Sequence, residues 1–140
     1  MAGSILILDD VEIGLTVMKM FLKKSGYSNI VTFDDPHTAL SYIKDTEVPS
    51  LIITDYKMPK MTGLDFLNLV SSLKPDIEAI IVTGDAKAVS GKCGKYTVVE
   101  KGCVDFFKNI LALVTSKMSK PKKTQTTFDS QKIKIGSMIS

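Results

Sequence analysis

The chain has 140 residues, of which 44% are hydrophobic and 24% charged, and a formal net charge of +3. This is the composition of one soluble domain that is large enough to bury a core. No apolar run approaches the ~20 residues of a membrane-spanning helix, and Asp9 and Asp10 interrupt the first apolar run too early for a signal peptide. We therefore expect a cytoplasmic protein with no membrane association.

The positive charge is concentrated near the C-terminus. Residues 119–140 hold five lysines against Asp129, a charge of +4, which leaves −1 on residues 1–118. The chain has no arginine, the residue that most often contacts bases and phosphates in a bidentate way. Nucleic acid binding by the lysine-rich tail is therefore the least favoured function. We expect residues 1–118 to form one domain and residues 119–140 a flexible tail, although Ile133 and Ile135 alternate with lysines and are also compatible with an added strand.

The two cysteines, Cys93 and Cys103, flank a predicted strand. About nine residues of extended chain place them roughly 25–30 Å apart. A disulfide requires Cα atoms within about 7 Å. We expect two free thiols, and without a histidine cluster they do not form a zinc site.

Strands and helices alternate along residues 4–118. Short apolar runs predict five buried strands, and apolar residues at helical spacing predict the helices between them. The strands are expected at 4–8, 29–33, 51–54, 79–82 and 97–99, and the helices at 12–25, 36–44, 62–73, a short weak one within 84–95, and a last one from 103 to 118. This alternation predicts an α/β fold with a parallel sheet and right-handed connections.

Local signals predict the ends of several helices. Gly26 suits the left-handed position after the first helix. Asp35 before Pro36 suits an N-cap, and Thr62 with Asp65 suits a capping box. In the last helix we expect a second apolar stripe, Phe106 and Leu113, beside a core-facing stripe made of Cys103, Phe107, Ile110, Leu111, Val114 and Met118.

Polar residues follow the predicted strands at their carboxyl ends. Asp55 follows the central run Leu51-Ile52-Ile53-Thr54, and alone it is more simply explained as a helix cap or turn residue. Asp9 and Asp10, Thr83 and Lys101 occupy the same position after other strands. Because open α/β sheets place their ligand sites at this edge, the five residues are expected to meet in one pocket.

The chemistry of this set favours phosphoryl transfer. Three neighbouring carboxylates need a compensating cation, and an all-oxygen donor set favours Mg²⁺. A lysine and a hydroxyl add a positive charge and a hydrogen-bond donor for a phosphoryl group. Asp55 itself can act as the nucleophile and form an acyl phosphate.

The set Asp9-Asp10, Asp55, Met58-Pro59 with Gly63, Thr83 and Lys101 resembles the receiver domain of bacterial two-component response regulators. The resemblance covers residues 4–118 with each motif at the expected strand end. It implies a flavodoxin-like (βα)5 doubly wound parallel sheet with strand order 2-1-3-4-5. It also implies phosphorelay signalling, in which Asp55 accepts a phosphoryl group from a histidine kinase or a histidine phosphotransfer protein.

The resemblance also implies roles for the other residues of the set. Asp10 and Asp55 hold Mg²⁺ directly, together with the backbone carbonyl of Lys57, and Asp9 acts largely through water. The hydroxyl of Thr83 donates a hydrogen bond to one phosphoryl oxygen, and Lys101 pairs with another.

Three departures from the family concern how a receiver domain passes its phosphorylation signal to a partner protein. Gly102 stands where the family has a proline after a cis peptide bond; since a cis bond before a residue other than proline costs about 2.5–4 kcal/mol, we expect a trans bond or a strained cis bond. Val98 replaces the switch aromatic, with Tyr96 two residues earlier, and the short interval from Thr83 to Lys101 predicts a short fourth helix.

We expect a stand-alone receiver, not an enzyme, that acts by contact with a downstream protein target. A homodimer through the face of the fourth helix, fifth strand and fifth helix is expected, with Phe106 and Leu113 as contacts. Two alternatives remain: a degenerate receiver that acts as a scaffold without phosphorylation, and a Mg²⁺-dependent phosphohydrolase. The second lacks the usual Asp two residues after the nucleophile, where Lys57 stands.

Overall fold

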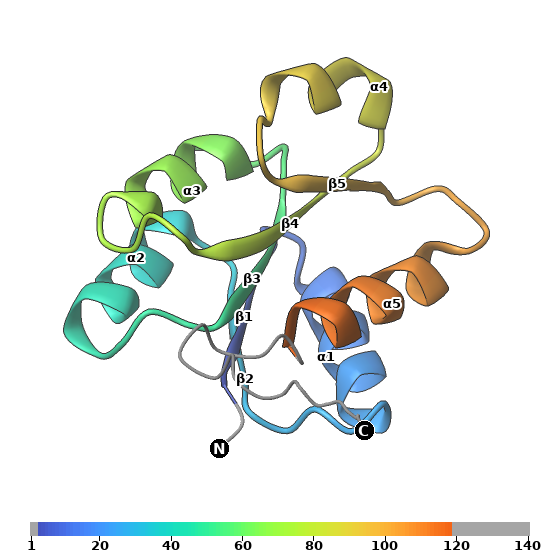
Figure 1. Ribbon diagram of the computed structural model, residues 1–140, viewed down its shortest axis with the longest axis horizontal. Helices are drawn as coiled ribbons and strands as arrows, with labels where there is room; N and C mark the ends of the chain where they lie inside the picture. Colours follow the sequence, from blue (N-terminus) through green and yellow to red (C-terminus); the bar gives the residue numbers. More distant parts are fainter. Residues whose placement is uncertain (1–2, 119–140) are drawn as a thin grey trace, which may run out of the picture.

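The computed structural model describes residues 3–118, which form a five-stranded parallel sheet covered by helices on both faces (Figure 1). The strand order is β2-β1-β3-β4-β5. This confirms the predicted α/β fold and its flavodoxin-like order. The predicted tail, residues 119–140, lies outside the described residues. Within residues 3–118, no helix has the length and apolar character needed to cross a membrane.

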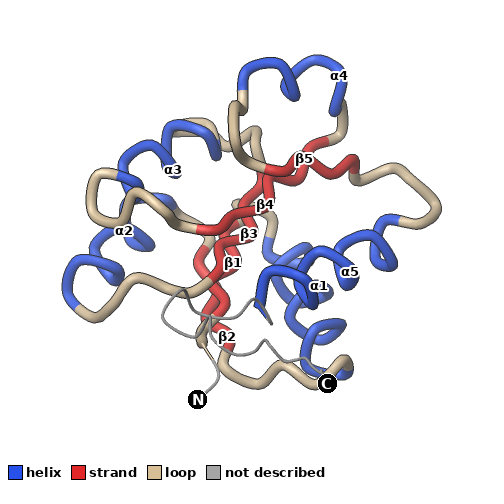
Figure 2. Tube along the Cα trace, in the orientation of Figure 1, coloured by secondary structure: helices blue, strands red, loops and turns tan. Residues whose placement is uncertain are grey.

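Five strands alternate with helices along the described chain (Figure 2). The strands are β1 (Ile5–Leu8), β2 (Ile30–Phe33), β3 (Leu51–Asp55), β4 (Glu78–Thr83) and β5 (Thr97–Glu100). The helices are α1 (Glu12–Lys24), α2 (Pro36–Asp45), α3 (Gly63–Ser71), α4 (Ala86–Val89) with a 3₁₀ turn at Ser90–Lys92, and α5 (Phe106–Met118). Because all strands run in one direction, their carboxyl ends share one edge of the sheet.

The sheet separates two apolar clusters, and β1 contributes to both. Side chains alternate between the faces of a strand. Ile5 and Ile7 pack with residues of α1 and α5, while Leu6 and Leu8 pack with residues of α2, α3 and α4. All four side chains are buried, as expected of a strand in a sheet that is covered on both faces.

Three predicted helix ends are present in the structure. Gly26 follows α1 with a φ of +104°, the left-handed conformation that glycine tolerates best. The carboxylate of Asp35 accepts a hydrogen bond of 2.9 Å from the backbone N–H of Thr38 at the start of α2. Thr62 and Asp65 form a reciprocal capping box at the start of α3, with hydrogen bonds of 3.1 and 3.2 Å.

Helix α5 begins at Phe106, three residues later than predicted, and its apolar face differs accordingly. Cys103 lies in the preceding loop and is exposed, and Phe107 is 36% exposed, so the predicted core stripe is wrong at both positions. Phe106 and Leu113 are partly buried and pack against the α1–α5 cluster. The predicted second stripe is therefore part of the core face, together with Ile110, Val114 and Met118, which the predicted core stripe placed there correctly.

The segment between β4 and β5 is as short as predicted. Helix α4 has four residues, and Gly94 with a φ of +56° precedes β5. Cys93 is buried under this segment, with its Sγ 3.2 Å from the backbone oxygen of Val89. Both cysteines are free thiols, as predicted.

Candidate functional site

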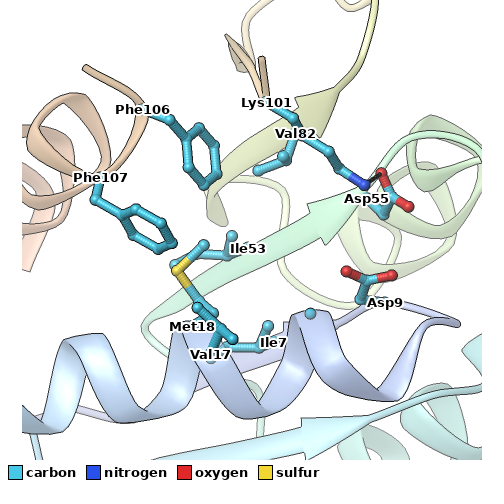
Figure 3. Close-up of a pocket in the computed structure, with 11 residues that line it drawn as sticks. Ile7, Asp9, Val17, Met18, Ile53, Asp55, Val82, Lys101, Phe106 and Phe107 are labelled. Atoms are coloured by element: carbon cyan, nitrogen blue, oxygen red, sulfur yellow. Dashed lines mark ion pairs between the residues drawn. The ribbon is translucent and has the colours of Figure 1, made fainter. Parts of the chain in front are cut away.

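Polar residues end four neighbouring strands at one edge of the sheet. Asp55 and Thr83 are the last residues of β3 and β4, and Asp9 and Lys101 directly follow β1 and β5. Figure 3 shows the side chains of Asp9, Asp55 and Lys101 together at this edge. The predicted convergence of strand ends therefore holds for these residues.

Asp9, Asp10 and Asp55 form a carboxylate cluster. One oxygen from each residue lies within 4.8 Å of the others. Asp55 is only 7% exposed, Asp9 is half-buried and Asp10 is exposed. Three negative charges at this spacing repel one another unless a cation lies between them, and a set of hard oxygen donors suits Mg²⁺. The residues present therefore fit a Mg²⁺ ion.

Lys101 is the cation that contacts this cluster. Its Nζ lies 3.0 Å from Oδ1 of Asp55, and the lysine side chain remains 41% exposed. Burial raises the pKa of Asp55, the Lys101 ion pair lowers it, and the charges of Asp9 and Asp10 raise it again. The net direction is upward, because one partly solvated lysine does not offset burial together with two like charges.

The hydroxyl of Thr83 lies at the carboxyl end of β4 and is buried. Its Oγ1 accepts a hydrogen bond of 3.2 Å from the backbone N–H of Asp85. The carboxylate of Asp85 in turn accepts a hydrogen bond of 3.2 Å from the N–H of Ala88 and caps α4. Since the hydroxyl uses a lone pair in this contact, its proton remains available for another acceptor.

An open pocket of about 620 Å³ lies over these residues. Its lining brings together most of the predicted site residues, namely Asp10, Asp55, Lys57, Thr83 and Lys101. The volume and the mixed charge suit a hydrated cation and a phosphoryl group side by side. Asp9 lies at the other side of the carboxylate cluster and lines a second cavity.

Two glycines fit closely around the carboxylates. A Cβ atom on Gly63 would lie 2.3 Å from the backbone oxygen of Asp55, and the N–H of Gly63 donates a 2.7 Å hydrogen bond to the carbonyl of Tyr56. A Cβ atom on Gly14 would lie 2.4 Å from Oδ2 of Asp9. No role was predicted for Gly14, since a glycine inside a predicted helix carries no signal about which side chain outside the helix lies against it.

The residues that depart from the family pattern pack away from the carboxylates. Val98 and Tyr96 are partly buried against the cluster under α2, α3 and α4. Burial raises the pKa of the Tyr96 phenol, and the Nζ of Lys95 lies 5.4 Å from the ring centroid. The described residues contain no cis peptide bond, so the bond between Lys101 and Gly102 is trans, as expected.

Comparison with known proteins connects this geometry to one family. Residues 5–108 match the family model of the response regulator receiver domain. Chemotaxis protein CheY of Pseudomonas aeruginosa is 35% identical over 86 residues, which cover 59% of this chain and 68% of that protein. A putative two-component response regulator of Arabidopsis thaliana, ARR21, is 30% identical over 101 residues, 70% of this chain but only 16% of that protein.

Solved structures show the same fold. A CheY-like receiver domain protein from Methanospirillum hungatei superposes with a TM-score of 0.72 at 26% identity, covering 84% of this chain and 94% of that one. The response regulator TrrA of Thermotoga maritima, solved in complex with Mg²⁺-BeF, gives a TM-score of 0.68 at 24% identity, with coverage of 81% and 97%. The similarity extends over nearly the whole of both solved domains.

Proposed function

Because this chain belongs to the response regulator receiver domain family, we propose that Asp55 accepts a phosphoryl group from a phosphohistidine of a histidine kinase or phosphotransfer protein. One observation carries the proposal: a buried carboxylate with a raised pKa lies at the centre of a sheet edge that also holds Asp9, Asp10, Thr83 and Lys101. Buried carboxylates with such neighbours are typical of reactive sites rather than of surface caps.

The transfer follows from this arrangement. A carboxylate oxygen of Asp55 forms a bond to phosphorus while the bond from phosphorus to the donor imidazole nitrogen breaks, and the imidazole keeps the electron pair and takes up a proton. The Nζ of Lys101 pairs with one phosphoryl oxygen, and the hydroxyl of Thr83 donates a hydrogen bond to another. Mg²⁺, when held by Asp10, Asp55 and the backbone carbonyl of Lys57, with Asp9 acting through water, supplies positive charge that offsets the anionic oxygens.

Acetyl phosphate and intact-mass measurement test this function. We expect a mass gain of one phosphoryl group with Mg²⁺, no gain in excess chelator, and no gain in Asp55→Asn. The Thermotoga maritima neighbour was solved with Mg²⁺-BeF, which supports testing the metal and a phosphoryl mimic together. A phosphoryl adduct that survives Asp55→Asn would place the acceptor elsewhere and contradict the proposal.

The phosphoryl donor is proposed to dock on an exposed apolar stripe of α1. Ile13 and Met20 are 67% and 60% exposed, and with Val17 they follow i, i+4, i+7 spacing on one face of the helix. Val17 and Phe107 of α5 also line the cavity that contains Asp55, so the stripe lies next to the acceptor. An apolar stripe beside a reacting group is a suitable surface for a helical partner that brings its histidine to that group.

The double variant Ile13→Ser/Met20→Ser distinguishes an effect on docking of the phosphoryl donor from an effect on the reactivity of Asp55. We expect slower transfer from a phosphorylated donor protein and unchanged phosphorylation by acetyl phosphate, which needs no docking surface. Leu69→Ser on α3 is the matched control, because Leu69 is also an exposed apolar residue but lies on the opposite face of the sheet. Equal transfer rates in the two variants would exclude α1 as the docking surface.

Output to a downstream protein is proposed to begin at the loop between β4 and α4. A hydrogen bond joins Thr83 to Asp85, and the N–H of Ala86 donates a 3.1 Å hydrogen bond to the carboxylate of Glu100, the last residue of β5. A shift of the Thr83 hydroxyl toward a phosphoryl group therefore acts on the N-terminus of α4 directly. This route requires no aromatic side chain at position 98.

A further inference from the structure

A second cavity lies beside the carboxylate cluster of Asp9, Asp10 and Asp55, between α1, α5 and the sheet (Figure 3). Its volume is about 270 Å³. Aromatic and aliphatic side chains from five elements form its apolar walls: Ile7, Val17, Met18, Ile53, Val82, Phe106 and Phe107. Asp9, Asp55 and Lys101 form its polar end, and the close-up shows the two rings and the carboxylates on opposite sides of the space.

This cavity is partly open to solvent, since Val17 and Phe107 of its lining are 41% and 36% exposed. Its volume of about 270 Å³ has room for one aromatic ring, because an apolar cavity of about 150 Å³ binds benzene. The two phenylalanines of the lining meet edge to face with ring centroids 5.0 Å apart. The rings and the sulfur of Met18 suit contact with an aromatic ring.

The polar end of the cavity favours a cation. Lys101 pairs with Asp55, whereas no lysine of the described residues lies within ion-pair distance of Asp9. Oδ1 of Asp9 accepts a hydrogen bond from the N–H of Val11 (3.0 Å), and its Oδ2 faces Gly14. The hydrogen bond from Val11 therefore fixes the Asp9 side chain next to the apolar walls.

We propose that this cavity binds a small arylalkylamine, with its ring between Phe106, Phe107 and Met18 and its ammonium group on Asp9. Since Asp9 also belongs to the cluster that fits Mg²⁺, such a ligand competes with the metal and opposes phosphorylation. The competition rests on the proposed function, whereas ligand binding itself does not.

Methyl NMR with 2-phenylethylamine as the probe tests the site. We expect saturable shifts of the methyl groups of Met18, Ile53 and Val82, and weaker binding when Mg²⁺ is present. The neutral isostere 2-phenylethanol is the control; it is expected to bind about tenfold more weakly, since it lacks the charge-assisted hydrogen bond. In Asp9→Asn this preference is expected to disappear while alcohol binding remains.

Two tryptophan variants on α1 distinguish the cavity from the outer surface. Val17→Trp places a ring over the cavity at a position 41% exposed, and we expect it to abolish binding of both probes. Met20→Trp is the matched control on the same helix, does not line the cavity and should bind as the natural chain does. Unchanged binding in Val17→Trp, or no preference for the amine, overturns the proposal.

The chain itself offers a competing occupant of the cavity. Val104 is 100% exposed in the loop two residues before Phe106. Nuclear Overhauser contacts between the methyl groups of Val104 and the ring of Phe106, together with absent probe shifts, would show that this loop closes the cavity and would also overturn the proposal. Phosphorylation by acetyl phosphate without the amine is measured separately, so failure here is distinguishable from failure of the receiver function.

Discussion

The backbone N–H of Lys101 donates a 2.8 Å hydrogen bond to the carbonyl of Thr83. This bond continues the β4–β5 ladder, in which Thr83 pairs with Glu100, past the end of β5. The two residues proposed to contact different phosphoryl oxygens are thus joined through the backbone. A movement of either residue therefore displaces the other.

Replacement of Lys101 by Met is expected to weaken the response to phosphorylation without unfolding the protein. The lysine is 41% exposed, so its ion pair with Asp55 contributes at most about 1 kcal/mol to the free energy of unfolding. Thermal unfolding with and without beryllofluoride, a phosphoryl mimic, measures both effects. Lys57→Met is the control, because it removes an exposed lysine of the same pocket and keeps the backbone carbonyl. A large stability loss in unmodified Lys101→Met would mean that the lysine is mainly structural.

Asp55→Asn is expected to raise the melting temperature at neutral pH in the absence of Mg²⁺. The folded protein raises the pKa of Asp55, so this group favours folding below its unfolded pKa and loses that contribution as pH rises through the folded pKa. At pH 7 the ionised carboxylate therefore opposes folding, and a neutral amide removes the penalty. We expect a gain of about 2–6 °C, corresponding to roughly 1 kcal/mol. Equal melting temperatures for both proteins at pH 7 would mean that burial of the ionised carboxylate does not destabilise the folded protein.

Gly63→Ala is expected to destabilise the protein by roughly 1–3 kcal/mol, since overpacked sites force the backbone to shift. The added methyl group would lie 2.3 Å from the backbone oxygen of Asp55, at the carboxyl end of β3. Urea unfolding measures the loss, and slower phosphorylation by acetyl phosphate is expected with it. Gly91→Ala provides the comparison, because a Cβ atom there meets nothing within 4 Å. Similar stabilities of the two variants would argue against the close fit at Gly63.

Asp35 is expected to titrate with a pKa of about 2. The hydrogen bond that Nζ of Lys60 donates to the Asp35 carboxylate (2.7 Å) is the main cause, followed by the hydrogen bond from the N–H of Thr38. Because the pKa is lowered from 3.8, the stabilisation from Asp35 is complete above its unfolded pKa and is lost as pH falls from about 3.8 to about 2. Carboxyl NMR shifts report the pKa directly. Lys60→Met should raise it, and an unchanged value would exclude the ion pair as the cause.

Beryllofluoride is expected to slow amide exchange at Gly84, Asp85 and Ala86. These residues form the loop after Thr83, and the hydroxyl of Thr83 accepts its hydrogen bond from the N–H of Asp85. Hydrogen exchange followed by mass spectrometry measures the change, and Thr83→Val, which lacks the hydroxyl, should show little of it. Protection confined to β5 would instead place the conformational response at that strand.

Much of the fold was predictable because local chemistry and tertiary packing agree. The apolar run Leu51–Thr54 is buried on both faces, and the caps at Asp35 and Thr62 depend on residues only three positions away. The meeting of Asp55 and Lys101 was predictable because parallel strands place their carboxyl ends at one edge.

The prediction for the last helix was wrong at its N-terminal end, whereas Ile110 and Val114 of the predicted core stripe are buried. Starting the last helix at Cys103 rather than Phe106 assigned Phe107 to the core and Phe106 to the surface. The close approach of Gly14 to Asp9 was not predictable, because it depends on the orientation of α1 relative to β1. The apolar cavity between α1 and α5 was not predictable either, because it depends on how these two helices pack on the sheet.

The contrast between the two thiols has a practical consequence. Burial raises the pKa of Cys93 and shields its sulfur, whereas Cys103 is exposed two residues after Lys101. A maleimide dye will therefore react at Cys103 first, with no engineered cysteine. The natural chain thus carries its own attachment point for a fluorescent label on the loop after β5 that holds Lys101, and the emission of that label can report binding at the carboxylate cluster in real time.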